Sequence, residues 1–300
     1  DCKMKKVLSI SLGSSDRNHK VIIKLDQQKI LVERIGTDGD LKKARELLKK
    51  YDGLVDAFGL GGIDLSLGIG KDKFKLKEAY KIIKGIKTPI FDGGGVKNTL
   101  DKIALSHLIK NLKIDFTDKK VFLVCACNRS GMAQEFENYG CKMTYGDFMF
   151  GLKVPIPIHS LKIGSFLARL SLPLITKLPQ KYIYPIGKSQ KIRKPKFVKY
   201  FNNADIIAGD FHYIYKYSPY DLSNKIIITT TTTKNDILSL KKRGVSCIIT
   251  TTPNMDGRSF GCNVVEAILY SYTIDEQKRT NYEELISKLK LKPTINSFES

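Results

Sequence analysis

Strand-like apolar runs alternate with amphipathic segments along most of this chain, and few folds accommodate that pattern. The clearest case is Lys120–Cys127, a continuous apolar run of the kind found in a buried parallel strand. The break Asn128–Gly131 and the helical segment Met132–Tyr139 follow it. Lys225–Thr231 and Val245–Thr251 are further strand-like runs, with an amphipathic segment between them. This order predicts β-α-β units with right-handed crossovers and a parallel sheet.

The first 119 residues open with β signals and then follow the same alternation. Val7–Leu12 and Ile30–Arg34 are predicted strands, Leu41–Tyr51 is an amphipathic helix, and Leu54–Leu60 is a strand candidate that runs into glycines. The predicted fold class is therefore α/β: two Rossmann-like parts with mostly parallel sheets around a cleft, and a β-rich N-terminus.

We predict an N-terminal α/β domain at 1–119, which could hold a substrate, and a Rossmann-like nucleotide-binding domain at 120–290. Residues 291–300 look like a polar tail. A proline-punctuated helical insert covers 154–195, and its stretch 161–178 is nearly all apolar. A buried or domain-bridging helix is the leading interpretation of that stretch. A lid over an apolar substrate, a homodimer contact and a monotopic membrane contact are the alternatives.

The formal net charge of +21 raises the question of nucleic acid. Only nine of the 51 basic residues are arginine, the preferred residue for bidentate phosphate and base recognition, and the lysines are scattered over the predicted helices. A lysine-rich surface is the leading interpretation, which argues against nucleic acid as a partner. Attraction of an anionic small molecule, of nucleic acid or of an acidic membrane surface is the alternative.

No apolar run reaches the about 20 residues needed to cross a bilayer, and the first apolar stretch is too short for a signal peptide, so we expect a cytoplasmic protein. The six cysteines form no disulfide framework, and with four widely spaced histidines we predict no structural metal.

Parallel α/β sheets bind ligands where their strands end, so the turns after the strands are the candidate sites. The turn of Asn128, Arg129, Ser130 and Gly131 lies where a dinucleotide fold places its phosphate turn. Asp147, at the end of the next strand, is suited to the ribose hydroxyls of a dinucleotide. Alternatively, Asp147 caps the turn that follows it.

A second turn precedes the last long helix and could also cradle an anion. Its candidate ligand-binding residues are Thr252, Gly257, Arg258, Ser259 and Gly261. The alternative is an ordinary loop with a helix cap. If the sheet brings Arg129 and Arg258 to one cleft, the two turns could hold two ends of one charged ligand.

Four residues are candidates for catalysis. Asp210 and His212 follow a short strand and could act as a general acid and base, although a structural histidine is the alternative. Asp92 and Lys97 flank a run of glycines and could orient a substrate hydroxyl or carboxylate.

Several motifs resemble a group of bacterial proteins labelled quinate 5-dehydrogenase or quinate/shikimate-dehydrogenase-like. They are Glu33–Asp40 (ERIGTDGD), Asp56–Asp64 (DAFGLGGID), Ala208–Ile214 (AGDFHYI) and Thr251–Gly261 (TTPNMDGRSFG). The resemblance implies a Rossmann-like oxidoreductase that uses NAD or NADP and acts on a polar hydroxy-acid-like substrate. Two alternatives stay open: a transferase that uses a nucleotide-activated donor such as a sugar nucleotide, and a non-catalytic nucleotide-binding protein.

Overall fold

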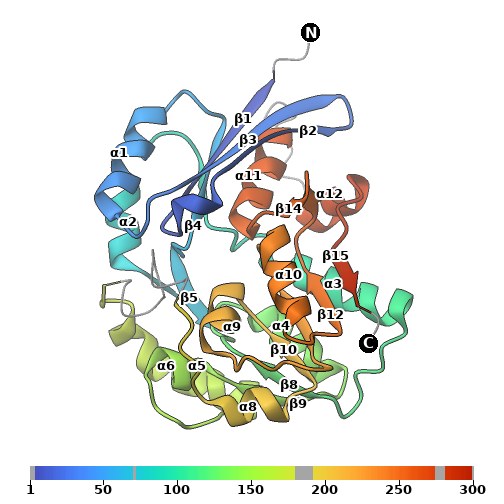
Figure 1. Ribbon diagram of the computed structural model, residues 1–300. Helices are drawn as coiled ribbons and strands as arrows, with labels where there is room; N and C mark the ends of the chain where they lie inside the picture. The colour runs from blue at the N-terminus through green and yellow to red at the C-terminus, as the bar shows by residue number, and fades with distance from the viewer. Residues whose placement is uncertain (1–3, 70–71, 180–191, 274–280, 299–300) are drawn as a thin grey trace.

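The computed structural model describes residues 4–69, 72–179, 192–273 and 281–298. It contains two sheet-bearing halves (Figure 1). Residues of both halves line a shared cavity. Both sheets are mostly parallel and carry helices on their faces, which confirms the predicted α/β fold class.

The first sheet has five strands in the order β2-β3-β1-β4-β7. They are β1 (Lys5–Ser11), β2 (His19–Leu25), β3 (Gln28–Gly36), β4 (Ala57–Gly61) and β7 (Ile90–Phe91). Only β2 runs antiparallel, as the first arm of a hairpin with β3. The sequence pattern thus predicted both the parallel alternation and the β-rich start.

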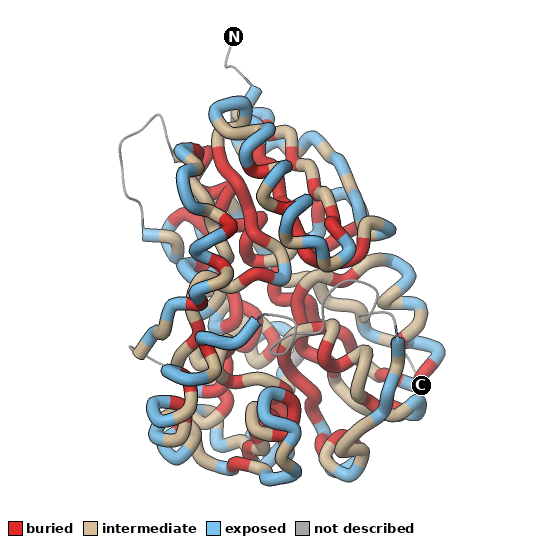
Figure 2. Tube along the Cα trace, turned by 90° about the vertical axis from the view of Figure 1, so that its left-hand side faces the viewer, coloured by how far each residue is buried: buried red, intermediate tan, exposed pale blue. Residues whose placement is uncertain are grey.

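Strand β1 shows why helices cover both faces of this sheet. Leu8 and Ile10 point to one face, where α1 (Leu41–Tyr51) and α2 (Lys77–Ile83) pack, whereas Val7 points to the other. The second face is covered by α11 (Cys262–Thr273), which follows the last parallel strand of the second sheet. A helix from the predicted domain at 120–290 therefore packs in the core of the first half. Figure 2 shows buried residues running through the middle of both halves.

The second sheet has six strands in the order β15-β12-β11-β10-β8-β9. They are β8 (Lys120–Leu123), β9 (Lys142–Tyr145), β10 (Ile206–Ala208), β11 (Ile226–Thr229), β12 (Cys247–Thr250) and β15 (Thr294–Ser297). Two helices, α3 (Lys97–Leu112) and α4 (Ser130–Asn138), pack on one face. The other face carries α8 (Val198–Asn203), α9 (Phe211–Tyr217) and α10 (Lys234–Lys242).

The smaller elements complete the chain. They are the hairpins β5 (Ser66–Ile69) with β6 (Asp72–Lys75) and β13 (Asn254–Met255) with β14 (Arg258–Ser259), and the helices α5 (Asp147–Gly151), α6 (Leu161–Ile175) and α12 (Tyr282–Lys288). The predicted insert thus contains α6, although its residues 180–191 lie outside the described part. Among the described helices, none has the length and apolar content to cross a membrane. The cytoplasmic location stays a prediction.

The predicted polar tail at 291–300 is wrong. Residues Thr294–Ser297 form β15, which pairs antiparallel with β12 and closes one edge of the second sheet. Ile295 lies opposite Ile249 and packs against the core. An edge strand leaves much of its length exposed, so its polar residues conceal it in the sequence.

Candidate functional site: a cleft between the two sheets

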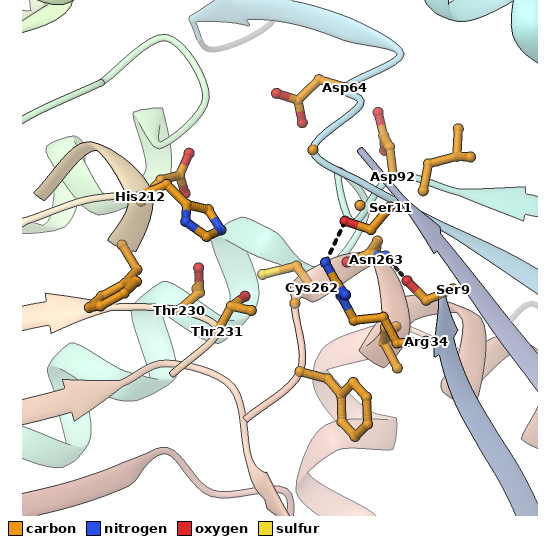
Figure 3. A pocket seen from close by; sticks show the side chains of 18 of the residues that line it. Ser9, Ser11, Arg34, Asp64, Asp92, His212, Thr230, Thr231, Cys262 and Asn263 are labelled. Atoms are coloured by element: carbon orange, nitrogen blue, oxygen red, sulfur yellow. Dashed lines mark hydrogen bonds between the residues drawn. The ribbon is translucent and has the colours of Figure 1, made fainter. Parts of the chain in front are cut away.

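The carboxyl ends of strands from both sheets meet at one cavity of ≈ 150 Å³. Ser11 and Gly61 at the ends of β1 and β4 line it from the first half, and Asp210 and Thr230 after β10 and β11 line it from the second. Figure 3 shows side chains of both halves around a shared space, with Asp64 and Asp92 on one side and Thr230 and Thr231 on another. The cavity adjoins a larger hollow of ≈ 660 Å³ that shares Arg17 and Arg258 with it.

Strand order explains why the second sheet contributes at this point. The chain moves from β8 to β9 on one side and then to β10 on the other, so the order reverses between β8 and β10. A crevice forms outside the carboxyl ends of strands at such a reversal. The loops after these strands meet there: Asn128 Nδ2 donates to Asp210 Oδ2 at 2.6 Å, and Arg129 Nη2 donates to Asp210 Oδ1 at 2.9 Å.

Three arginines from separate elements converge on one end of the cleft. Arg34 lies on β3 and donates to Ser11 Oγ at 2.9 Å and to the Ser14 carbonyl at 3.1 Å. Arg17 lies in the turn after β1 and pairs with Asp236 at 2.8 Å. Arg258 lies on β14 and donates through Nη1 to the Arg17 carbonyl oxygen.

This arginine cluster is short of acceptors. Nε and Nη2 of Arg258 are buried without a hydrogen-bond partner in the described part of the chain. Burial, with Arg258 and Arg17 nearby, lowers the pKa of Arg34 to about 9, and burial and Arg17 lower the pKa of Arg258 to about 10. A buried donor without a partner costs about 1–3 kcal/mol, so the arginine cluster is complementary to an anion.

The opposite wall carries charges of both signs. Lys97 Nζ lies 3.5 Å from Asp64 Oδ1. Asp92 is held in place because its two oxygens accept from the backbone amides of Leu65 and Gly94, at 2.7 and 2.9 Å. Burial alone would raise the pKa of Asp210, but Arg129 and Lys97 outweigh it and the pKa is about 2. This wall therefore offers carboxylates and an ammonium group, which suit the hydroxyls of a ligand.

His212 lies in the first turn of α9 and borders the cleft (Figure 3). Burial lowers its pKa from 6.5 to about 3, and Arg17 and Arg34 add to the shift. The imidazole is therefore neutral at physiological pH, and it can accept a hydrogen bond or donate one but adds no charge to the arginine cluster.

This shift predicts a pH dependence of stability. The folded pKa of His212 is below the unfolded value, so its contribution to the free energy of unfolding is present above pH 6.5 and is lost as pH falls from 6.5 through about 3. We expect His212→Gln to weaken the acid-induced loss of stability in that window, measured by urea unfolding. His159→Gln, on an exposed surface, is the matched control and should follow the unmodified protein. Identical pH profiles for His212→Gln and the unmodified protein would contradict a neutral His212.

The structure brings all four predicted catalytic residues to this cleft. Lys97, Asp92, Asp210 and His212 line the same cavity, although they come from regions up to 120 positions apart. The proposed pairing of Asp210 with His212 differs in detail. Asp210 is the residue before helix α9 and accepts from Asn128 and Arg129, whereas His212 lies in the first turn of that helix.

The predicted cofactor-binding residues divide into two groups. Arg129, Arg258 and Gly261 line the cavity, and Gly257 lines the adjoining hollow. The rest line neither space: Asn128, Ser130, Gly131, Asp147, Thr252 and Ser259. The arginines of both turns thus line one cleft. Arg129 is a buried partner of carboxylates, whereas Nε and Nη2 of Arg258 have no hydrogen-bond partner among the described residues.

Asp147 does not occupy the position of a ribose ligand. Its carboxylate accepts from the backbone amides of Ala126 at 2.9 Å and Cys127 at 2.8 Å, and it borders a separate apolar cavity of ≈ 70 Å³ beneath α6. Gly131 N donates to Asn98 Oδ1 at 3.2 Å, so the turn after β8 is tied to helix α3. Protein groups therefore occupy the Asp147 carboxylate and the Gly131 amide, two of the groups that the sequence assigned to a dinucleotide. The alternative interpretation, in which Asp147 stabilises a turn, agrees with the geometry.

Sequence reasoning missed the contributions of the first sheet. Ser9, Ser11 and Arg34 are polar residues inside otherwise apolar strands, and all three line the cavity. Asn263 donates from Nδ2 to Ser9 Oγ at 3.0 Å and links α11 to β1 (Figure 3). The sequence did contain one signal for this contribution: Arg34 lies in a strand whose other residues alternate between apolar and polar. A charge buried in such a strand requires partners.

Two family models match the chain. One, described as domain of unknown function (DUF8754), matches residues 95–298, and the other, described as domain of unknown function (DUF8753), matches residues 6–92. The two matches meet just ahead of α3. A search of curated proteins finds no match.

Solved structures resemble the chain only in general arrangement. A galactofuranose binding protein is 11% identical over 98% of this chain and 94% of that chain, with a TM-score of 0.39. Hetero-hexameric glutamate dehydrogenase from Thermus thermophilus is 10% identical over 96% of this chain and 74% of that chain, with a TM-score of 0.42. L-tryptophan dehydrogenase from Nostoc punctiforme is 11% identical over 87% and 65%, with a TM-score of 0.32. Such low values carry no argument about activity.

Proposed function

Since the chain belongs to the DUF8754 family, whose description names no activity, we propose a function from the cleft itself: the protein binds a small, hydroxyl-bearing anion between its two halves. The anionic group, a carboxylate or a phosphate, lies against Arg17, Arg34 and Arg258. The hydroxyls face the wall of Asp64, Asp92 and Lys97.

One observation carries this proposal. Arg258 borders the cleft and keeps two buried guanidinium nitrogens that find no acceptor among the described residues, next to two more guanidinium groups. Packing three such cations together raises the free energy of the folded state. A ligand oxygen with negative charge satisfies the donors and offsets the repulsion, and planar guanidinium groups bind carboxylate and phosphate in a bidentate manner.

The size of the cavity supports a small ligand. A space of ≈ 150 Å³ accommodates a compact molecule, and the adjoining hollow of ≈ 660 Å³ leaves room for a larger substituent on the side of Arg17 and His212. Two halves joined by α3 and by the return of the chain to α11 could close on such a ligand, as two-lobed proteins do.

A panel of ligands tests this function. We expect calorimetric titration with inorganic phosphate, a cyclic polyhydroxy acid such as quinate, and a sugar phosphate to give saturable binding by at least one of them. The neutral sugar that corresponds to the sugar phosphate is the matched control and should bind at least about ten-fold more weakly, because it lacks the charge. Equal binding of the neutral and the charged sugar, or no binding by any anion, would contradict the proposal.

An oxidoreductase that uses NAD or NADP is a second candidate, and the Lys97–Asp64 pair favours it. Burial alone would lower the pKa of Lys97, but Asp64, 3.5 Å away, outweighs it and raises the pKa. Lys97 is therefore an ammonium group that could donate a proton to the oxygen of a carbonyl substrate as it is reduced. The same titration with NADH and NADPH addresses this candidate, with a uridine nucleotide to represent the transferase alternative. Saturable binding of a nicotinamide dinucleotide would support it, and loss of turnover in Lys97→Met with retained binding would assign the acid–base role to Lys97.

A further inference from the structure

Helix α6 presents a stripe of large apolar side chains to solvent. Ile163, Phe166, Leu170 and Leu174 on the helix and Leu178 just beyond it are between 47% and 67% exposed. Their spacing of three and four residues places them on one face. We call these five residues the outer stripe.

The outer stripe is separate from the face by which α6 is attached to the protein. Leu161, Ala168 and Leu172 are buried and belong to the main core. Arg169 Nε donates to Asp72 Oδ2 at 2.6 Å and links the helix to β6. The helix lies at the outside of the molecule beside α5 (Figure 1). The core therefore needs the inner face of α6 and leaves the outer stripe available.

Along the sequence the charge next to this helix is one-sided, although Glu137 and Asp72 from other segments contact the helix. Residues 148–204 contain 11 lysines and arginines and no aspartate or glutamate, although the chain as a whole has 30 acidic residues. Lys162 on α6 and Lys177 after it are both exposed. Apolar side chains flanked by basic ones form the composition of a helix that lies in the plane of a membrane interface.

From the outer stripe and this charge we propose that α6 docks the protein on an anionic lipid surface. The apolar side chains enter the boundary between headgroups and acyl chains, and Lys162 and Lys177 lie at the level of the phosphates. A second copy of the chain fits the stripe less well, because a symmetric contact would bring two basic segments together. The helix has 15 residues and lies along the surface instead of crossing it.

Co-sedimentation with vesicles tests this docking. We expect the protein to bind vesicles that contain phosphatidylglycerol and to leave vesicles of phosphatidylcholine alone unbound, with binding that weakens as salt is raised. The variant Phe166→Ser/Leu170→Ser/Leu174→Ser should lose about ten-fold or more in partitioning, because three inserted side chains are removed. Lys162→Glu/Lys177→Glu should lose a similar factor on phosphatidylglycerol vesicles.

Ile22→Ser/Leu238→Ser is the matched control, because both side chains are 55–58% exposed and lie outside α6. It should bind vesicles like the unmodified protein, and both serine variants should keep their urea unfolding midpoints. Three results would overturn the proposal: no vesicle binding by the unmodified protein, unchanged binding by the triple serine variant, or a dimer in sedimentation velocity that the triple variant abolishes in the absence of lipid.

Discussion

Replacing Arg258 by alanine should nearly abolish anion binding in the cleft while leaving the free energy of unfolding unchanged or higher. Nε and Nη2 of Arg258 are buried donors that have no partner in the part of the chain that the structure describes. Each charge-assisted hydrogen bond to a ligand contributes about 1.5–3 kcal/mol, so loss of two should weaken binding by about a hundred-fold or more. Stability should not suffer in proportion, because the residue is crowded by Arg17 and Arg34. Binding is measured by calorimetry with the tightest anion of the panel, and stability by urea unfolding.

Arg243→Ala is the matched control for Arg258→Ala. Burial also lowers the pKa of Arg243 to about 10, and its Nη1 is likewise buried without a partner among the described residues. Its guanidinium donates to the Tyr220 carbonyl and to Ser218 Oγ, however, and it does not line the cleft. This control should lose about 1–3 kcal/mol of stability and keep its affinity. Arg258→Lys should bind with intermediate affinity, since it keeps the charge without the planar fork. If Arg258→Ala binds the anion as tightly as the unmodified protein, the arginine cluster is not the binding site.

The sequence predicted the location of the cleft better than its chemistry. Lys97, Asp92, Asp210 and His212 were found because each follows a predicted strand, and parallel strands of a sheet end at one edge. That rule needs only the order of strands and helices along the chain, which can be predicted from a single sequence. The rule applies to both halves of this protein, so four residues from distant segments could be assigned to one site.

The residues that the sequence missed depend on contacts between the halves. Arg34 lies inside a strand, where the same residue type would more often be a surface charge. Arg34 belongs to the site because it donates to Ser11 and because Arg258 on β14 lies nearby. The local sequence around Arg34 gives no sign that Arg258 lies close to it. Helix α11 could not be assigned to the first sheet either, because its apolar side chains, such as Val265 and Ile268, suit the face of either sheet equally well.

Asp147 and the turn of Arg129 were assigned to a dinucleotide for one shared reason. A carboxylate after a second strand and a polar turn after a first are the signature of such a site, but they also stabilise loops. Here Asp147 accepts from backbone amides of the loop, and Arg129 is 1% exposed. Burial of the side chain, which decides between the two roles, is not a local property of the sequence.

Arg129→Ala should therefore destabilise the fold, although the sequence assigned Arg129 to ligand binding. Arg129 Nη1 lies 2.8 Å from Asp101 Oδ1, and Asp101 is fully buried. Arg129 also donates to Asp210 at 2.9 Å and to Thr230 Oγ1 at 3.0 Å. Removing one partner of a buried pair leaves an uncompensated charge and costs about 3–5 kcal/mol. Urea unfolding measures the loss.

Arg169→Ala is the matched control, because it removes an ion pair of similar length, 2.6 Å to Asp72, whose side chains are exposed. The Arg169→Ala variant should lose about 0–1 kcal/mol of stability.

The pH dependence distinguishes loss of the Arg129–Asp101 ion pair from a simple loss of packing in Arg129→Ala. Burial raises the pKa of Asp101, and Arg129 counteracts the shift. Without Arg129 the folded pKa of Asp101 rises further, so the deficit should be smallest at low pH and should grow as pH rises through that pKa. A deficit below that of Arg169→Ala, or one that is constant with pH, would show that the Arg129–Asp101 pair does not hold α3 against the turn after β8.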